Sequence, residues 1–183
     1  AVGDDCWGEE SLFVKPEELE KQLQYLSENG YETIFFEDLS HIEQYEKPVL
    51  LTFDDGYDDN AETLLPLLRK YGMKATIFLI AGDVGKPHKL TRAQLAELVQ
   101  SGLVSIQSHG WSHRNMADMG WAELISELLR SKLAAAIKAS GAALKPEDIT
   151  VKLTNGGRNN RNSSDTTAYL NAGEENNGAI TFY

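Results

Sequence analysis

The sequence predicts an α/β fold, in which a parallel sheet is covered by helices and is either a barrel or an open doubly wound sheet. Stretches rich in β-branched and aromatic residues alternate with stretches whose apolar residues recur at helical spacing, as in parallel sheets with helices outside them. One apolar stretch, residues 49–56, stops at two adjacent carboxylates, Asp54 and Asp55, and a glycine. Because α/β folds place active sites at the carboxyl ends of their strands, we expect the functional site there.

The elements before the acidic pair are a helix and a short strand. Pro16 suits the first turn of a helix, leucines form its apolar stripe, and Asn29-Gly30 ends it. Residues 31–36 predict a strand, and residues 43–47 form a polar connection. The run 49–56 has no polar alternation, which predicts a parallel strand that is buried on both faces.

A second helix and strand follow the acidic pair. Asn60 is a candidate cap for a helix that Gly72 stops. Pro66 lies inside this helix and predicts either a kink or a helix that begins near Leu65. Residues 74–80, rich in Ile, Thr and Phe, predict the next strand.

A third helix and strand follow, then a further helix, and after it the sequence becomes polar. Thr91-Arg92-Ala93-Gln94 has the form of a capping box for a helix that ends at Gly102. Residues 103–108 predict a strand, and residues 121–140 carry apolar residues at helical spacing. Beyond these we expect a fifth strand, a long or disordered polar loop and a final strand, at residues 148–153, 154–165 and 179–183.

Composition limits the possible classes of function. A chain of 183 residues with 42% apolar content suits one globular domain. The net charge of −11 argues against binding to nucleic acid or to an anionic membrane surface. Cys6 is the only cysteine, so neither an internal disulfide nor a zinc ribbon can form. No stretch approaches the ~18 apolar residues of a membrane span.

Two of the four histidines are paired in a way that favours a metal site. His109 and His113 follow the strand at residues 103–108, and at this spacing they face the same way if the segment is helical. With one aspartate they form the ligand set of a catalytic zinc site, which leaves positions open for water and substrate. One carboxylate of the acidic pair would then bind the cation while the other takes a proton from a water. The competing interpretation is a loop of solvated acids, supported by Asp58 and Asp59.

The motif Thr52-Phe53-Asp54-Asp55-Gly56, together with the pair His109 and His113, resembles the polysaccharide deacetylases of the chitooligosaccharide deacetylase type, carbohydrate esterase family 4. The resemblance implies a shortened or distorted (β/α) barrel related to the seven-stranded barrel of that family. It implies that Asp54 is the catalytic base and that Asp55, His109 and His113 hold a divalent metal, with Zn²⁺ first and Co²⁺ or Mn²⁺ as alternatives. It is strongest over residues 11–141, so we expect residues 142–183 of a single domain, 1–183, to be divergent or incomplete.

The chain also departs from the family pattern. Gly110 stands where Ser or Thr is usual, and Arg114 stands where Pro is usual. A family motif containing Arg-x-Pro-Tyr has only a weak counterpart at Arg158. A late Asp with Trp, and a late Leu-x-His that supplies the general acid, have no counterpart after His113 and Trp121.

The function that the resemblance implies is the removal of N-acetyl groups from N-acetylglucosamine units of peptidoglycan, a chitin-like polymer or poly-N-acetylglucosamine. Tyr57, Trp111 and Arg158 are candidate substrate contacts. An acetyl-ester deacetylase acting on xylan and a catalytically weak carbohydrate-binding relative remain alternatives. A calcium loop built on the aspartates is less favoured because the required acid spacing is absent. Such substrates imply an extracellular or cell-envelope location, although the chain contains no signal peptide.

Overall fold

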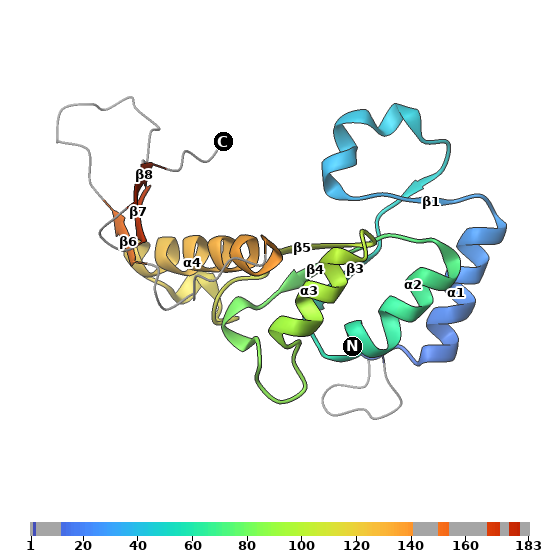
Figure 1. Cartoon of the computed structure of the whole chain (residues 1–183), viewed down its shortest axis with the longest axis horizontal. Helices are drawn as coiled ribbons and strands as arrows, with labels where there is room; N and C mark the ends of the chain where they lie inside the picture. Colours follow the sequence, from blue (N-terminus) through green and yellow to red (C-terminus); the bar gives the residue numbers. More distant parts are fainter. Residues whose placement is uncertain (1, 3–11, 141–149, 154–167, 173–175, 180–183) are drawn as a thin grey trace.

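The computed structural model describes residues 2, 12–140, 150–153, 168–172 and 176–179, and side chains at residues 2 and 12–132. Its central element is a three-stranded parallel sheet in the order β3-β4-β5 (Figure 1). These strands are Thr52–Asp55, Ala75–Leu79 and Val104–Ser108. In this register Asp55 pairs with Leu79 and Leu79 with Ser108, so the carboxyl ends of all three strands lie level at one edge.

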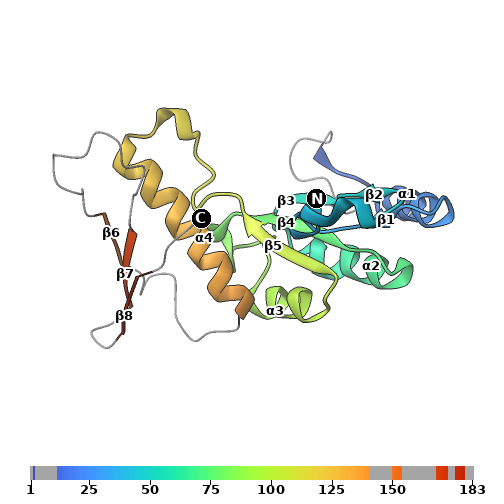
Figure 2. The ribbon, with the colours of Figure 1, turned by 90° about the horizontal axis from the view of Figure 1, so that it is seen from above.

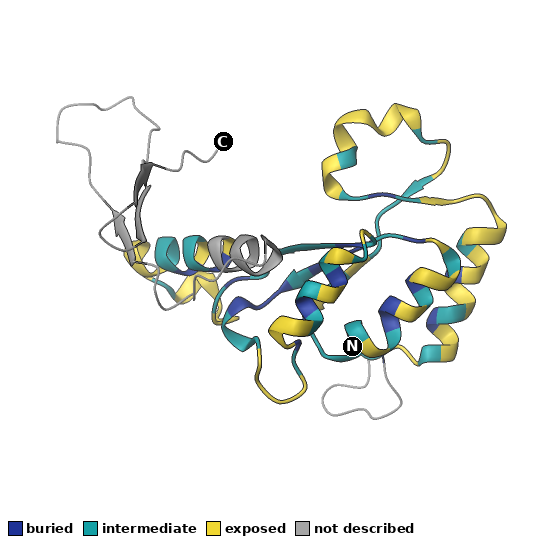
Figure 3. Ribbon diagram, in the orientation of Figure 1, coloured by how far each residue is buried: buried dark blue, intermediate teal, exposed yellow. Residues whose placement is uncertain are grey.

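Helices connect the strands and cover one face of this sheet (Figure 2). Helix α2 (Leu65–Tyr71) leads from β3 to β4, and α3 (Arg92–Gln100) leads from β4 to β5. Their leucines join those of α1 (Pro16–Glu28) and the apolar residues of β4 in one buried cluster. Figure 3 shows buried positions on α2, α3 and β4, the elements that contribute to this core. The alternation of strand and helix predicted from the sequence is therefore present.

The apolar run at residues 49–56 differs from its prediction. Pro48–Val49 forms a separate strand, β2, which pairs in parallel with β1 (Glu32–Thr33). In β3, Phe53 packs against the core cluster while Thr52 and Asp54 are exposed. The prediction of a strand buried on both faces is wrong, because alternate side chains of β3 point to opposite faces and only the face that carries Phe53 packs against the helical core.

The predicted strand at residues 31–36 is also shorter than expected. Phe36–Gln44 forms a 3₁₀ helix, η2, in place of the end of the strand and part of the polar connection. Its start is fixed by Asp38, whose carboxylate accepts a hydrogen bond from the Phe35 backbone N–H at 2.9 Å. A local side-chain acceptor of this kind competes with continued strand pairing.

The helix boundaries predicted from Pro66, Gly72 and the capping box are confirmed, whereas Asn60 is not a cap, because it lies inside the first helical turn and its Oδ1 atom accepts no hydrogen bond. Asn60–Leu64 forms one π-helical turn, η3, and the α-helix begins at Leu65, as Pro66 predicted. Gly72 ends α2 with a left-handed backbone, φ +64°. At α3 the Thr91 hydroxyl accepts from the Gln94 N–H at 3.2 Å, and the Gln94 side chain accepts from the Thr91 N–H at 2.9 Å. This reciprocal pair is the predicted capping box.

Helix α4 (Trp121–Ser140) follows β5 as predicted, and it packs against β5 and α3. Beyond it, β6 (Thr150–Leu153), β7 (Ala168–Ala172) and β8 (Asn176–Ala179) form an antiparallel sheet in that order. The expected fifth strand is thus present as β6, but it pairs with β7 and does not extend the parallel sheet. Of the predicted final strand only Ala179 is described, as the end of β8. The polar run at residues 154–165, Arg158 and Cys6 lie outside the described residues.

Candidate metal centre

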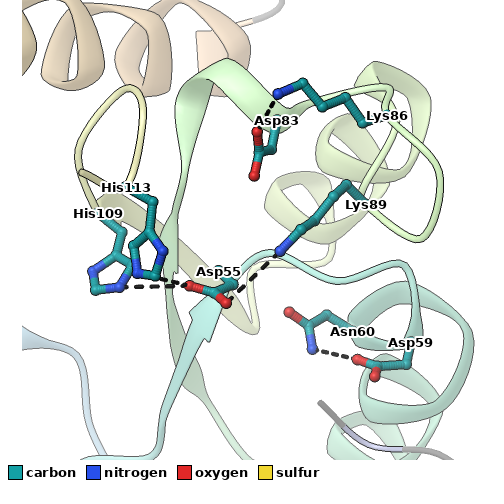
Figure 4. Close-up of polar contacts among 8 residues, drawn as sticks. All are labelled: Asp55, Asp59, Asn60, Asp83, Lys86, Lys89, His109 and His113. Carbon is teal, nitrogen blue, oxygen red and sulfur yellow. Dashed lines mark hydrogen bonds and ion pairs between the residues drawn. The ribbon is translucent and has the colours of Figure 1, made fainter. Parts of the chain in front are cut away.

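Three of the predicted site residues converge at the carboxyl edge of the parallel sheet (Figure 4). Asp55 ends β3, and His109 and His113 follow β5. The Asp55 Oδ1 atom lies 3.5 Å from His109 Nε2 and 3.6 Å from His113 Nε2. All three ligand atoms lie within 4.8 Å of one another. Ligands of a tetrahedral zinc ion, each about 2.0–2.2 Å from the metal, are about 3.3 Å apart, so this donor set fits such an ion.

The two histidines are brought together by a turn. The helical arrangement considered for them is not adopted, because the residues after β5 leave regular structure at His109. Gly110 and His113 both have left-handed backbones, with φ +81° and φ +57°, and the two imidazole ring centroids are 5.0 Å apart. The histidine loop, residues 109–113, therefore folds back on itself.

Two of the three candidate ligands have strained backbones. Asp55 has φ +73° and His113 has φ +57°, in the left-handed region that non-glycine residues rarely adopt. Such strain costs of order 1–3 kcal/mol and persists where the surrounding structure enforces it, typically at functional sites. Gly56 follows Asp55 with φ +74°, and a Cβ atom there would lie 2.3 Å from Leu79 Cδ1. Glycine is thus required at the turn that directs Asp55 toward the histidines.

Asp54 directly precedes Asp55 in β3. Its side chain is exposed, and its backbone carbonyl accepts from the Gly56 N–H at 3.0 Å, which closes the turn. The two adjacent acids therefore have different surroundings. Asp55 is engaged with the histidines, whereas Asp54 is exposed to solvent.

Lys89 is a site residue that the sequence did not single out. Its Nζ atom lies 3.8 Å from Asp55 Oδ2, on the side of the carboxylate away from the histidines (Figure 4). The same ammonium group lies 3.6 Å from the centroid of the Tyr57 ring. Burial lowers the pKa of Lys89, against the opposing effect of the nearby Asp55 and Asp83 carboxylates. The antiparallel bridge between Tyr57 and Lys89 brings it here, and that contact has no local sequence signal.

Tyr57, a predicted substrate contact, interacts with the cluster itself. Burial, followed by a hydrogen bond to Asp55 and the charge of that carboxylate, raises the pKa of Tyr57 to about 12. Lys89 occupies one face of the ring, so a sugar could not stack on that face. The phenol thus holds its proton beside Asp55 across the physiological range.

Trp111, the second predicted substrate contact, lies within the histidine loop and is partly buried. The Arg130 guanidinium carbon lies 4.8 Å from its ring centroid. Its backbone carbonyl accepts from the Gly82 N–H at 2.9 Å, and a Cβ atom at Gly82 would come within 2.4 Å of that oxygen. The loop therefore packs tightly between α4 and the turn after β4.

A cavity of about 470 Å³ opens beside the histidines. Its lining residues come from the histidine loop, the segment after it and helix α4, and they include His109, His113, Arg114, Met116 and Glu127. Glu127 was not predicted as a site residue, although an acid within an apolar helical stripe is an unusual pattern.

The two downstream acids do not join the ligand cluster. Among the described residues the only group of potential metal ligands is Asp55 with His109 and His113. Asp59 instead accepts hydrogen bonds from the Val2 backbone N–H at 2.6 Å and from the Asn60 amide at 2.7 Å. Its burial raises its pKa. This geometry does not match a loop of solvated acids or a calcium loop.

Comparisons with known proteins identify relatives of this chain. The family model for polysaccharide deacetylase matches residues 41–161. YxkH of Bacillus subtilis, named as a polysaccharide deacetylase, is 42% identical over 127 residues, which cover 67% of this chain and 45% of that protein. The poly-β-1,6-N-acetyl-D-glucosamine N-deacetylase of Escherichia coli K12 is 26% identical over 131 residues, which cover 61% of this chain and 20% of the enzyme.

A solved structure shows the same relationship. The crystal structure of BA0330 from Bacillus anthracis, described as a polysaccharide deacetylase, superposes with a TM-score of 0.71 and 33% identity. The match covers 77% of this chain and 45% of that one, so the chain spans about half the length of BA0330 and of YxkH and a smaller share of the Escherichia coli enzyme. This similarity confirms the expected fold class, a shortened (β/α) barrel related to the barrel of the polysaccharide deacetylases.

Proposed function

The chain belongs to the polysaccharide deacetylase family, and from this premise we propose that it is a metal-dependent hydrolase that removes N-acetyl groups from N-acetylglucosamine units of a polysaccharide. The observation that carries the proposal is the convergence of Asp55, His109 and His113 within 4.8 Å at the carboxyl edge of the sheet. Poly-N-acetylglucosamine is the first substrate to test, because the Escherichia coli relative is named for that polymer. Peptidoglycan and chitin-like polymers share the same acetamide.

Asp55, His109 and His113 would hold the metal, and Zn²⁺ best suits two imidazoles and one carboxylate, with Co²⁺ or Mn²⁺ as alternatives. A metal bound there would polarise the acetamide carbonyl and acidify a water. Asp54, which is exposed and directly precedes Asp55, would take the proton of the attacking water as general base. Lys89 and the Tyr57 phenol contact Asp55 and would hold its carboxylate in place.

Tyr57, Trp111 and Arg158 are the proposed substrate contacts. Aromatic faces suit the apolar faces of sugar rings, and a cavity opens beside the histidine loop that carries Trp111. We also propose an extracellular or cell-envelope location, where such polysaccharides lie. No helix of the described part of the chain is both long and apolar enough to cross a membrane. Detection of the chain in cell fractions tests this location.

A second candidate function is carbohydrate binding with little turnover. It applies to these 183 residues taken by themselves, in which no histidine follows His113 to match the general-acid histidine that the family resemblance implies. General-acid catalysis typically contributes roughly 10²- to 10⁴-fold to the rate. The second candidate therefore predicts normal metal and oligosaccharide binding with turnover far below the ordinary range of about 1 to 10³ per second.

Two measurements on the same protein test the proposal. Metal content is determined after loading with Zn²⁺ or Co²⁺, and acetate release is measured with β-1,6- and β-1,4-linked N-acetylglucosamine oligomers and with acetylated xylan. The double variant His109→Ala, His113→Ala should lose both the metal and acetate release. His41→Ala, an exposed histidine in η2, is the matched control and should keep both.

Each outcome separates the candidates. Acetate release from the oligomers supports amide hydrolysis, whereas release from xylan alone supports the ester alternative. Metal and oligomer binding without acetate supports the binding candidate. Equal metal content in the wild type and the double variant would show that the metal centre is elsewhere.

A further inference from the structure

Glu127 on helix α4 is a buried acid that the proposed chemistry does not use. Only 8% of the residue is exposed. Its Oε1 atom accepts three hydrogen bonds from the histidine loop: from the Trp111 N–H at 2.8 Å, the Ser112 N–H at 2.5 Å and the Ser112 hydroxyl at 3.0 Å. A carboxylate is retained in such surroundings when donors satisfy it, and charge-assisted bonds of this kind are the stronger ones. The carboxylate therefore anchors the middle of the loop.

Two further residues on the same face of α4 contact the segments that flank the loop. Ser131, one turn after Glu127, is fully buried and shares a 2.6 Å hydrogen bond with the hydroxyl of Ser108 at the end of β5. Glu123, one turn before, pairs with Arg114. Residues spaced by four lie on one face of a helix. Helix α4 thus contacts the chain before His109, between the two histidines, and after His113.

The loop is shaped to fit around this carboxylate. Gly110 has φ +81°, and a Cβ atom placed on it would lie 3.2 Å from Glu127 Oε1. A side chain there would press on the carboxylate and also strain the backbone. His113 follows Ser112 with a left-handed backbone, which persists only where the surroundings enforce it. The hydrogen bonds that Ser112 donates to Glu127 supply such enforcement.

We propose that Glu127 is a positioning residue that fixes the relative placement of His109 and His113, and thereby sets the affinity and coordination geometry of the metal site. The inference rests on the proposed function in one respect, namely that a metal binds this cluster. Glu127 touches neither metal nor substrate in this role. It acts through the backbone of Trp111 and Ser112.

The test measures metal binding by the folded protein. Zn²⁺ affinity is obtained by competition with a chelator, and the visible absorption of bound Co²⁺ reports coordination geometry. Glu127→Ala should weaken Zn²⁺ binding by about 10- to 100-fold, the usual effect of losing an outer-shell partner, and should change the Co²⁺ bands. Glu127→Gln keeps an oxygen that can accept the three bonds, so it should recover most of the affinity and the wild-type bands.

Glu97→Ala is the matched control, because it removes an exposed acid from α3 that pairs only at the surface with Arg69. This variant should bind Zn²⁺ with the wild-type affinity and show the wild-type Co²⁺ bands. If circular dichroism shows that Glu127→Ala is unfolded, Gly110→Ala probes the same contact from the loop and should weaken Zn²⁺ binding in the same way.

Wild-type affinity and wild-type Co²⁺ bands in a folded Glu127→Ala or Gly110→Ala variant would overturn the positioning role while leaving the metal centre intact. A wild-type protein that binds neither ion would overturn the metal centre itself, and the positioning role with it. The two failures are therefore distinguishable.

Discussion

Asp54 and Asp55 are adjacent, yet they differ in backbone, exposure and partners. Asp55 adopts φ +73° at the end of β3 and lies beside both histidines, Tyr57 and Lys89. Asp54 is exposed to solvent. A residue already engaged by two potential metal ligands is suited to hold a cation, and a free carboxylate beside it is suited to accept a proton. The structure thus favours the division of roles that the family resemblance implies.

Asp54→Asn tests this division of roles. The amide has nearly the same size but cannot accept a proton from water, so turnover should fall by about 10²- to 10⁴-fold while metal content stays at the wild-type level. Acetate release and bound metal are measured on the same sample. Loss of the metal in Asp54→Asn, with retention in Asp55→Asn, would show that the two roles are reversed.

Tyr57 gives a prediction about pH. Its pKa is raised to about 12 in the folded protein, above the ordinary value of 10.0, so the folded state keeps this proton where the unfolded state loses it. The Tyr57 contribution to the free energy of unfolding is therefore fully present below pH 10 and is lost as pH rises toward about 12.

The measurement compares denaturant unfolding of the wild type and Tyr57→Phe across this alkaline range. The wild type should lose stability more steeply than the variant, which lacks the ionisation. Parallel curves would contradict the raised pKa. A phenolate absorbance titration gives an independent reading, because the difference between the two proteins should appear only near pH 12.

At the scale of elements, the sequence predicted best where a single residue type restricts the backbone. Pro66 located the start of α2, and Thr91 with Gln94 located the start of α3, because ring geometry and reciprocal capping act over a few residues. The burial of β3 was predicted wrongly, since which faces of a strand are covered depends on elements far away in the sequence. The local pattern of residues 49–56 does not contain that information.

The candidate site was likewise predictable where local restrictions act and not where distant elements decide. Asp55, His109 and His113 were predictable because strand ends at one edge of a parallel sheet meet. The turn that joins the histidines was not, because it depends on hydrogen bonds to Glu127 on a later helix. Lys89 was missed because its place depends on a long-range bridge to Tyr57. Residues that position others through tertiary contacts leave no motif in the sequence.

Gly72 gives a prediction for helix α2. It ends the helix with φ +64°, and no atom lies within 4 Å of a Cβ placed there, so conformation alone decides the cost of substitution. Gly72→Ala should lower the free energy of unfolding by roughly 1–2 kcal/mol, the cost of a left-handed backbone for a residue with a Cβ. Gly72→Asn is the control at the same position and should lose less, because asparagine tolerates this conformation better. Equal losses in denaturant unfolding would mean that the helix end has rearranged.

At the scale of the whole molecule, the site lies at the edge of the parallel sheet that packs on the leucine core. The leucine core of α1, α2 and α3 supports β4, and β4 holds β3 and β5 in register, so the ends that carry Asp55 and the histidine loop cannot shift independently. Helix α4 then adds the contacts to the loop. A ligand bound to residues from these segments should therefore stabilise the sheet as one unit.

Metal binding should therefore stabilise the entire described fold. A ligand that binds only the folded state adds RT ln(1 + [L]/Kd), or about 2.7 kcal/mol at roughly 100 times Kd, and for a chain of this size each kcal/mol raises Tm by about 2–4 °C. Zn²⁺ should thus raise Tm by several degrees in calorimetry. The double variant His109→Ala, His113→Ala should show no such rise, and His41→Ala should behave as the wild type. Because the net charge of −11 attracts any dication, Mg²⁺ at the same concentration is the ionic control. An equal rise with Mg²⁺, or in the double variant, would assign the effect to general charge screening and not to the histidine site.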